Sequence, residues 1–121
     1  MQIGSILSEA VGRYLDLTTD QMKLTASNLA NIDTPGYKTQ GIDFASAFSG
    51  AIKSLGDDAS TVSTPQVSDV QGLVARGDGN NVSMDRESLD LAKEQLQFRT
   101  GVEFLKHEYS RTMSAIHADA K

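Results

Sequence analysis

The side chains of this sequence that could do chemistry are few and scattered. The only histidines, His107 and His117, lie ten positions apart in a segment with helical periodicity. Two imidazoles that share a metal on one helix lie three or four positions apart, so these two point in different directions. The chain has no cysteine, which excludes thiolate nucleophiles, disulfides and cysteine-ligated metals. We therefore expect no metal site.

The acidic and glycine-rich motifs are equally weak as catalytic signals. Asp57 and Asp58 are adjacent in a polar stretch, where neighbouring carboxylates are usually solvated. The stretch GDGNNVS, residues 77–83, lacks the ligand spacing and the glycine position of an EF-hand calcium loop. The tripeptide RGD at residues 76–78 is short enough to occur by chance, and no Ser/His/Asp set or phosphate-binding glycine loop is present. We expect no catalytic residues, no cofactor and no enzymatic activity.

Length and charge limit the remaining classes of function. The chain has 121 residues, enough for one modest domain, and carries 11 basic against 16 acidic residues, a net charge of −5. Without a cluster of positive charge, nucleic-acid binding is not expected. No apolar run approaches the ~20 residues that span a bilayer, so we expect no membrane insertion. Residues 1–10 have no basic segment followed by a long apolar one, so no cleaved secretory signal is expected either.

The elements that would position these side chains begin with an N-terminal helix over residues 1–32. Its apolar positions recur in alternating steps of four and three, which is typical of a coiled-coil seam. The seam comprises Ile3, Leu7, Ala10, Tyr14, Leu17, Gln21, Leu24 and Asn28. Asn28 is polar at a seam position, which predicts a specific hydrogen bond that fixes the register of the helix.

A second long helix is predicted over residues 83–121. Either Ser83 or Asp85 is suited to cap its N-terminus. Gly101 is its one weak position, costing up to about 1 kcal/mol relative to alanine. The same alternation of four and three gives a matching seam: Leu91, Gln95, Phe98, Val102, Leu105, Tyr109, Thr112 and Ile116.

Between the helices, residues 33–82 are rich in Gly, Ser, Thr, Asp and Asn and predict an irregular connecting segment. Apolar residues at helical spacing indicate one short helix over residues 43–55, with Asp43 as its N-cap. Short strands are predicted at residues 61–67 and 72–77. The fold class is therefore mainly α, a coiled-coil-like pair of terminal helices joined by an irregular middle.

Such a pair is marginal on its own, because the apolar residues of two seams must offset the backbone entropy of two long helices. We expect further partners to cover these seams from outside.

The end of the N-terminal helix is specified in unusual detail. Thr34, Pro35, Gly36 and Tyr37 fit a turn with proline second and glycine third, as in type II. The residue before proline is driven out of the α region, so the helix cannot continue. Asn31 is predicted to end the helix in a left-handed conformation, which asparagine tolerates.

The stretch TASNLANIDTPGYK, residues 25–38, resembles the N-terminal signature of the axial proteins of the bacterial flagellum, which comprise rod, hook and hook-associated subunits. Residues 80–116, from NNVSMDRESL through QLQF to SAI, resemble the C-terminal end of the small proximal rod members of that family. The resemblance covers both terminal thirds. Ser27 replaces an asparagine and Ile32 a small residue of the usual signature, and neither change affects the turn.

The resemblance implies a structural subunit of the flagellar rod, the tubular shaft that transmits torque for motility. Such subunits are exported unfolded by the flagellar type III system without a cleaved signal and assemble in the periplasm. The implied partners are copies of the chain, other rod subunits, the FliE-type adaptor of the MS ring and the export gate.

The residues implied to make these assembly contacts come from both seams and from the turn. In the N-terminal segment they are Leu7, Tyr14, Leu17, Leu24, Asn28, Asn31, Thr34, Pro35, Gly36 and Tyr37. In the C-terminal segment they are Leu91, Phe98, Val102, Leu105, Tyr109 and Ile116. The two seams are expected to pack on each other, within or between subunits, and the turn is expected to fix where the chain leaves the tube wall. The alternative is a soluble helical adaptor or type III-secreted protein that binds one partner through the same seams.

Overall fold

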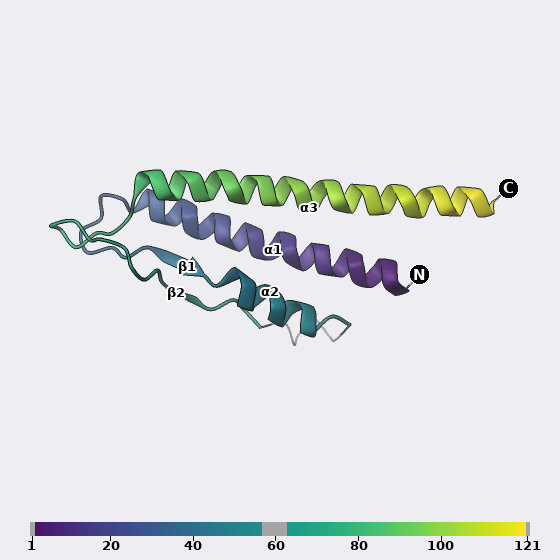
Figure 1. Ribbon diagram of the computed structural model, residues 1–121, viewed down its shortest axis with the longest axis horizontal. Helices are drawn as coiled ribbons and strands as arrows, with labels where there is room; N and C mark the ends of the chain where they lie inside the picture. Colours follow the sequence, from purple (N-terminus) through teal and green to yellow (C-terminus); the bar gives the residue numbers. More distant parts are fainter. Residues whose placement is uncertain (1, 57–62, 121) are drawn as a thin grey trace.

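The computed structural model describes residues 2–56 and 63–120, and it is mainly helical, as predicted. Two long helices pack side by side, and the segment that connects them, with one short helix and two short strands, lies along α1 (Figure 1). The elements in chain order are α1 (Gln2–Ala30), β1 (Gln40–Ile42), α2 (Phe44–Lys53), β2 (Val67–Asp69) and α3 (Met84–Asp119).

The helices α1 and α3 lie side by side and run in opposite directions, and their packing is the largest contact between elements (Figure 1). On its other side α1 contacts β1 and α2. The helix α1 is therefore the central layer, with α3 on one side and the middle segment on the other. Both chain ends lie at the same end of the molecule, where α3 extends past the start of α1 (Figure 1).

Side-chain caps begin two of the helices, as the sequence predicts. The Ser83 hydroxyl accepts a hydrogen bond from the Arg86 N–H at 3.4 Å at the start of α3. The Asp43 carboxylate accepts from the Ser46 N–H at 3.2 Å and from its hydroxyl at 2.8 Å at the start of α2. These two hydrogen bonds from Ser46 lower the pKa of Asp43, since they stabilise its charged form.

The strands are not where the sequence predicted them. The antiparallel partners β1 and β2 pair Gln40 with Asp69 and Ile42 with Val67. Residues 72–77, predicted as a strand, form turns and extended loop instead, and of the predicted strand at 61–67 only Val67 is in β2. Residues 61 and 62 lie outside the described residues. The strand β1 has little intrinsic strand propensity, and contacts from α1 described below hold it in place.

The interior of the chain is more polar than its helical periodicity suggests. Among the residues that the structure describes, the buried hydrophobic side chains are only Leu17 and Val82. The buried polar ones are more numerous: Thr18, Thr25, Asn28, Thr39, Asn80, Glu87 and Glu94. The fold of the single chain therefore depends on paired polar groups as much as on apolar burial.

The predicted seam of α3 is shifted from the face that α3 buries. The buried positions of α3 are Glu87, Glu94 and Gly101, which recur every seven residues. Five of the eight predicted seam side chains are instead exposed: Gln95, Phe98, Tyr109, Thr112 and Ile116. The period was predicted correctly, but periodicity alone does not tell whether an apolar row faces its own chain or the outside.

Gly101 is a point of close approach between the helices rather than a weakness of α3. A Cβ atom on Gly101 would lie 2.7 Å from Leu15 Cδ2 and 3.4 Å from Tyr14 Cδ1. The absence of a side chain thus lets α1 approach α3 closely.

An aromatic cluster docks α2 on α1. The ring of Tyr14 meets those of Phe44 and Phe48 edge to face, with centroids 5.5 and 5.6 Å apart. Such edge-to-face pairs are favourable beyond the area that they bury. Tyr14, predicted to pack on the seam of α3, therefore directs its ring to α2 while its edge borders Gly101.

Arg13 ties the other end of α2 to α1. One guanidinium nitrogen donates to the Ala51 carbonyl and to the Ser54 hydroxyl, both at 2.6 Å. The other donates to the Ser54 carbonyl at 3.2 Å and to Glu9 at 2.7 Å. Because the last carbonyls of a helix have no partner within it, Arg13 caps the C-terminus of α2.

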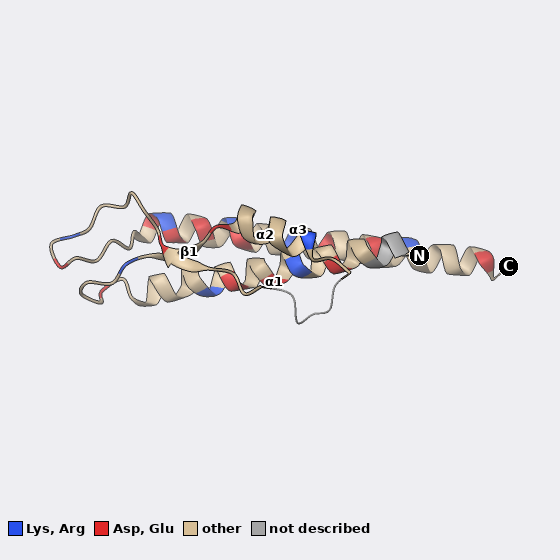
Figure 2. Cartoon of the chain, turned by 90° about the horizontal axis from the view of Figure 1, so that it is seen from below, with Lys and Arg blue, Asp and Glu red and all other residues tan. Residues whose placement is uncertain are grey.

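Charges of both signs are interspersed along the surface of α3 (Figure 2). Neighbouring turns pair Arg86 with Asp90 at 3.7 Å and Lys106 with Glu103 at 3.3 Å. These local pairs balance one another, so the exposed apolar side chains between them are the distinctive feature of this surface.

Candidate functional site

The helix α1 ends through hydrogen bonds of Asn31 rather than through a left-handed residue. The Asn31 side-chain amide donates to the Ser27 carbonyl at 2.8 Å and its oxygen accepts from the Thr34 hydroxyl at 3.1 Å. Among the described residues only glycines have positive φ, so the left-handed conformation predicted for Asn31 is wrong. Its side chain instead adds a second hydrogen bond to the Ser27 carbonyl, which already accepts from the Asn31 backbone N–H at 3.1 Å.

The turn after α1 has the predicted form. The Tyr37 N–H donates to the Thr34 carbonyl at 3.2 Å, and Gly36 has a φ of 74°. A positive φ at the third position is what a type II turn requires, and Pro35 precedes it at the second.

The loop that precedes α3, residues 76–82, clamps this turn. Asn80 is completely buried, and its amide donates to the carbonyls of Asn31 at 2.8 Å and Thr34 at 2.9 Å. Its side-chain oxygen accepts from the Val82 N–H at 2.8 Å. The side chain of Asn80 therefore pairs backbone hydrogen-bonding groups at the end of α1, in the turn and just before α3.

Two glycines let the turn and the loop meet backbone to backbone. The Gly36 N–H donates to the Asp78 carbonyl at 2.9 Å, and a Cβ on Gly79 would lie 3.4 Å from Gly36 Cα. Arg76 also donates to the Ile32 carbonyl. The tripeptide RGD at residues 76–78 is thus part of this clamp.

The same loop holds the chain beyond the turn. The Asn81 side-chain oxygen accepts from the Thr39 N–H at 2.7 Å and from its hydroxyl at 2.9 Å, and Thr39 is completely buried. Lys38 Nζ donates to the Gly79 carbonyl at 2.6 Å. Sequence reasoning missed Thr39, Asn80 and Asn81 as structural residues. The signal for them was the pair of adjacent asparagines just before the cap of α3.

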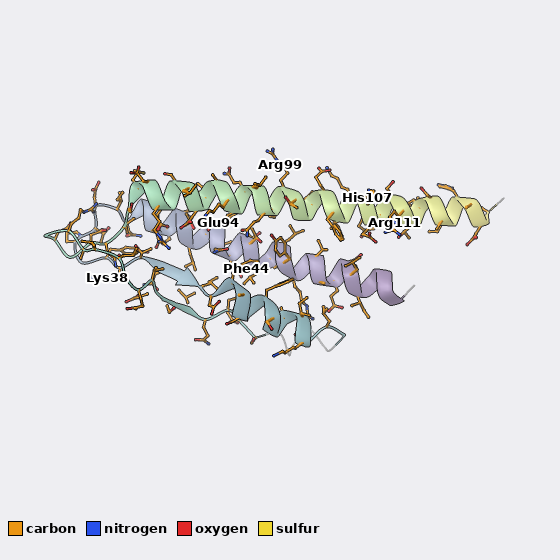
Figure 3. All side chains as sticks on the ribbon, viewed as in Figure 1. Lys38, Phe44, Glu94, Arg99, His107 and Arg111 are labelled. Carbon is orange, nitrogen blue, oxygen red and sulfur yellow. The ribbon has the colours of Figure 1, made fainter. Side chains whose placement is uncertain are left out.

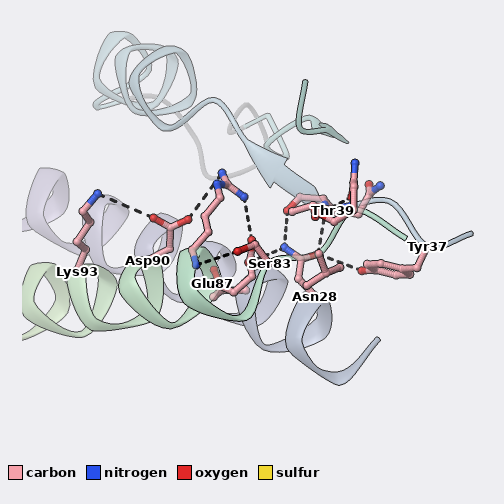
Figure 4. A network of polar contacts seen from close by, with 12 residues as sticks. Asn28, Tyr37, Thr39, Ser83, Glu87, Asp90 and Lys93 are labelled. Carbon is pink, nitrogen blue, oxygen red and sulfur yellow. Dashed lines mark hydrogen bonds and ion pairs between the residues drawn. The ribbon is translucent and has the colours of Figure 1, made fainter. Parts of the chain in front are cut away.

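We call the joint the region where the end of α1, the turn at residues 34–37, β1, the loop at residues 76–82 and the first turn of α3 meet. Asn28 lies at its centre (Figure 4). Its amide nitrogen donates to the Gln40 carbonyl and to Glu87 Oε2, each at 2.9 Å. Its oxygen accepts from the Gln40 N–H at 3.0 Å and from the Tyr37 hydroxyl at 3.1 Å. The side chain thus uses its full hydrogen-bonding capacity. Its amide pairs with both the N–H and the carbonyl of Gln40, as a peptide group of a third strand beside β1 would. The hydrogen bond predicted for this seam position is present.

Glu87 is the residue of α3 that accepts the hydrogen bond from Asn28. It is 1% exposed, and its second oxygen accepts from Arg86 at 2.8 Å (Figure 4). Arg86 also approaches Asp90 at 3.7 Å, and Asp90 approaches Lys93 at 4.0 Å. A buried carboxylate needs such compensation, because removing its charge from water is costly.

Glu94 lies two turns further along the same face and is less well satisfied. It is 3% exposed, and Oε1 accepts from the Thr25 hydroxyl at 2.9 Å. Oε2 has no hydrogen-bond partner among the described residues. Burial raises the pKa of Glu94, the hydrogen bond from Thr25 opposes that rise, and the charges of Asp90 and Glu87 add to it.

The structure brings together one group of the predicted site residues and separates the other. The joint contains Asn28, Asn31, Thr34, Gly36 and Tyr37. Pro35 is in the same turn and is exposed. Along the helices, Leu17 is buried and the half-buried residues are Leu7, Tyr14, Leu24, Leu91, Val102 and Leu105. The exposed residues are Phe98, Tyr109 and Ile116.

The residues considered for chemistry stand apart from this joint. His107 and His117 are exposed on α3 (His107 in Figure 3), and Asp57 and Asp58 lie outside the described residues. Over residues 2–56 and 63–120, no three His, Cys, Asp or Glu side chains are grouped so that they could hold a metal ion. Nor does any described helix have the length and apolar character to cross a membrane.

Comparison with known proteins identifies the class of protein to which the chain is similar. The sequence profile of the family described as flagella basal body rod protein matches residues 16–38. This range covers the second half of α1 and the turn that the loop clamps. The class defined by this segment is that of the flagellar basal body rod proteins.

Relatives extend the similarity over most of the chain. The chain is 31% identical over 123 residues to flagellar basal body rod protein FlgB of Yersinia enterocolitica, covering 84% of this chain and 87% of that protein. It is 30% identical over 119 residues to FlgB of Salmonella typhimurium (84% and 86%), and 29% identical over 122 residues to FlgB of Escherichia coli K12 (86% and 88%). The chain belongs to the FlgB family of flagellar basal body rod proteins. It is accordingly a structural subunit of the flagellar basal body rod.

Proposed function

We propose that this chain builds the proximal part of the rod by packing α1 and α3 against the corresponding helices of neighbouring subunits, and that it does so without catalytic activity. The observation that carries the proposal is the number of large apolar side chains that α3 leaves exposed. They are Met84, Leu89, Leu96, Phe98, Phe104, Tyr109, Met113 and Ile116.

Burial of these side chains would supply stability that the single chain lacks. Each fully buried large apolar side chain contributes ~1.5–3 kcal/mol, whereas only two hydrophobic side chains are buried in the described part of the single chain. Tyr109, Met113 and Ile116 recur at helical spacing in the C-terminal part of α3. A neighbouring helix would cover this row.

The three segments would then have distinct roles in assembly. Residues 1–32 and 83–121 would form the wall of the tube through their seams. The clamped turn at residues 34–37 would fix the direction in which residues 33–82 leave that wall. The support for this assignment is that Asn28 and Asn80 each bond to segments far apart in the sequence.

Family membership and the resemblance of the two terminal stretches support the setting that we propose for this assembly. The subunit would be exported by the flagellar type III system without a cleaved signal and would assemble in the periplasm. It would contact copies of itself, other rod subunits, the FliE-type adaptor and the export gate at the rod base. There it would transmit torque to the distal rod.

The test is electron cryo-microscopy of basal bodies from a strain that lacks this chain, beside the complemented strain. We expect an MS ring without a rod, and a rod again after complementation. Complete rods in the deletion strain would overturn the proposal. A finite complex of the chain with one partner would favour the helical adaptor instead.

A matched pair of variants tests the surface of α3 itself. Replacing Met113 and Ile116 together by glutamine should reduce rod assembly, because both side chains are exposed apolar residues. Replacing Ser110 and Ser114 by glutamine adds the same polar groups at exposed positions of the same helix segment and should leave assembly unchanged. Because all four positions are exposed, the stability of the single chain should change little in either double variant. Equal assembly of the two would contradict the role of this surface.

A further inference from the structure

A polar pocket lies beside the joint, between α1, the strand pair and α3. Its volume is about 260 Å³. A water molecule occupies roughly 30 Å³ of liquid, so the pocket has room for several waters or for the end of one long side chain.

The pocket carries an excess of negative charge. Its lining includes four carboxylates, from Asp43, Glu87, Asp90 and Glu94, and one cation, Arg86. Arg86 already contacts both Glu87 and Asp90.

Three of the four carboxylates have a polar partner in the chain for each of their two oxygen atoms. Asp43 accepts from Ser46 at the cap of α2, and Glu87 accepts from Asn28. Asp90 is near Arg86 and Lys93. The fourth, Glu94, is therefore the carboxylate that still lacks a hydrogen-bond donor for one of its oxygen atoms.

The unmet acceptor is one oxygen atom of Glu94. Glu94 lies between α3 and α1 (Figure 3) and is buried, and its Oε2 has no partner in the described part of the chain. Burial of an acceptor without a hydrogen bond is unfavourable, and more so for a charged group. Glu94 lines the pocket, so a donor that reached Oε2 from the pocket would remove this cost.

The chemistry of that donor follows from the lining. A metal ion is disfavoured, since no group of three acidic or histidine side chains in the described residues is arranged to hold one. An ammonium or guanidinium group supplies both positive charge and several N–H donors on a long flexible stem.

We propose that the pocket receives a lysine or arginine side chain of a neighbouring rod subunit, whose cationic group binds Glu94 Oε2. The inference rests on the proposed function, since it assumes that subunits pack side by side. Charge complementarity with the acidic lining selects this occupant over an apolar one.

The first test compares Glu94→Gln with Glu103→Gln. The glutamine at position 94 keeps the acceptor for Thr25 but removes the charge and places an amide donor at the pocket. We expect about tenfold or more weaker incorporation into rods, the scale of one hydrogen bond between charged groups, with the single chain still folded. Glu103 is exposed and pairs with Lys106, so its variant should assemble normally.

The second test uses wild-type single chains, so it does not depend on the folding of a variant. N-acetyl-lysine amide and N-acetyl-arginine amide are titrated into ¹⁵N-labelled protein, with N-acetyl-glutamine amide as the neutral control. We expect saturable shifts of the amide signals of Thr25 and Glu94 with at least one cationic probe and none with the neutral one.

Either of two results would overturn the inference. One is normal rod incorporation of the Glu94→Gln chain, which would mean that the pocket holds only water. The other is the absence of saturable shifts with both cationic probes. Neither result touches the proposed function, which fails only if rods are complete without the chain.

Discussion

Asn28 Nδ2 donates to Glu87 Oε2 at 2.9 Å, although the two residues are 59 positions apart in the chain. Both side chains are buried, Asn28 in the last turns of α1 and Glu87 in the first turn of α3. The two stretches that resemble the flagellar axial proteins therefore meet at this bond. This contact gives a physical reason for the specific polar residues at the end of α1, since Asn28, Asn31 and Thr34 each have a partner in the other stretch or in β1.

Replacement of Asn28 by alanine should destabilise the chain by about 1–3 kcal/mol, the cost of leaving buried hydrogen-bonding groups unpaired. The variant leaves the peptide groups of Gln40 and one oxygen of Glu87 without their partner. Urea unfolding followed by circular dichroism measures the difference.

The matched control is Ser27→Ala, because Ser27 is the preceding helical residue and its side chain is exposed. It should change the free energy of unfolding by less than about 0.5 kcal/mol. An Asn28→Ala chain as stable as this control would mean that the joint contributes little to the fold.

Gly36→Val should disrupt the clamped turn. Gly36 has a φ of 74°, where an L-residue is strained by roughly 1–2 kcal/mol and a β-branched one by more. We expect a lower melting temperature and reduced swimming in soft agar.

Gly77→Val is the control, because Gly77 lies in the clamping loop without positive φ and with open space around its Cβ position. Normal motility of the Gly36→Val strain would show that the geometry of the turn is not needed for assembly.

Two helical glycines should respond differently to alanine. A Cβ on Gly12 would meet nothing within 4 Å, whereas one on Gly101 would lie 2.7 Å from Leu15 Cδ2. Gly12→Ala should therefore stabilise the chain by up to about 1 kcal/mol through helix propensity. In Gly101→Ala, overpacking that typically costs 1–3 kcal/mol offsets this gain. Thermal unfolding of the two variants compares them, and an equal gain in both would mean that α1 and α3 separate easily.

The stability of the single chain should depend on pH through Glu94. Its pKa is raised in the folded chain, so the folded state binds the proton more tightly than the unfolded state. The contribution of Glu94 is therefore favourable at pH values below the usual carboxyl range. It decreases as the pH rises from the unfolded pKa, about 4.3, through the raised folded value.

Glu94→Gln removes this titration. The variant should be more stable than wild type at pH 7, and the difference should shrink towards pH 4, as measured by urea unfolding at both values. The exposed Glu103→Gln variant should show no such change between the two pH values. A Glu94→Gln chain that is less stable than wild type at pH 7 would contradict the raised pKa.

The features predicted from the sequence are those with local causes. The two long helices follow from their periodicity, and the caps Ser83 and Asp43 from the chemistry of a helix start. The turn at residues 34–37 follows from the fixed φ of Pro35 and the positive φ that Gly36 tolerates.

The features that were missed are caused by contacts between distant residues. The strand β1 is held by the side chain of Asn28, and Asn80 acts only because its loop returns to the turn. The exposed Phe98 and the buried Glu94 reverse the usual preference of their residue types. A row of apolar residues on a rod subunit need not face its own chain, so burial within one chain was the least predictable property.

The last prediction concerns Arg13, which was not recognised in the sequence. Its side chain is 11% exposed and donates to the carbonyls of Ala51 and Ser54 at the end of α2. Hydrogen bonds to a charged group contribute about 1.5–3 kcal/mol, so Arg13→Met should weaken the docking of α2. Backbone amides of residues 44–53 should then exchange about tenfold faster or more in hydrogen–deuterium exchange. The amides of α3 should keep their protection, because the hydrogen bonds that Arg13 donates within the described residues run to Glu9, Ala51 and Ser54. Lys23→Met, at an exposed position of the same helix, should leave the exchange of α2 unchanged. If α2 exchanged at the same rate in both variants, the aromatic cluster around Tyr14 alone would hold it in place.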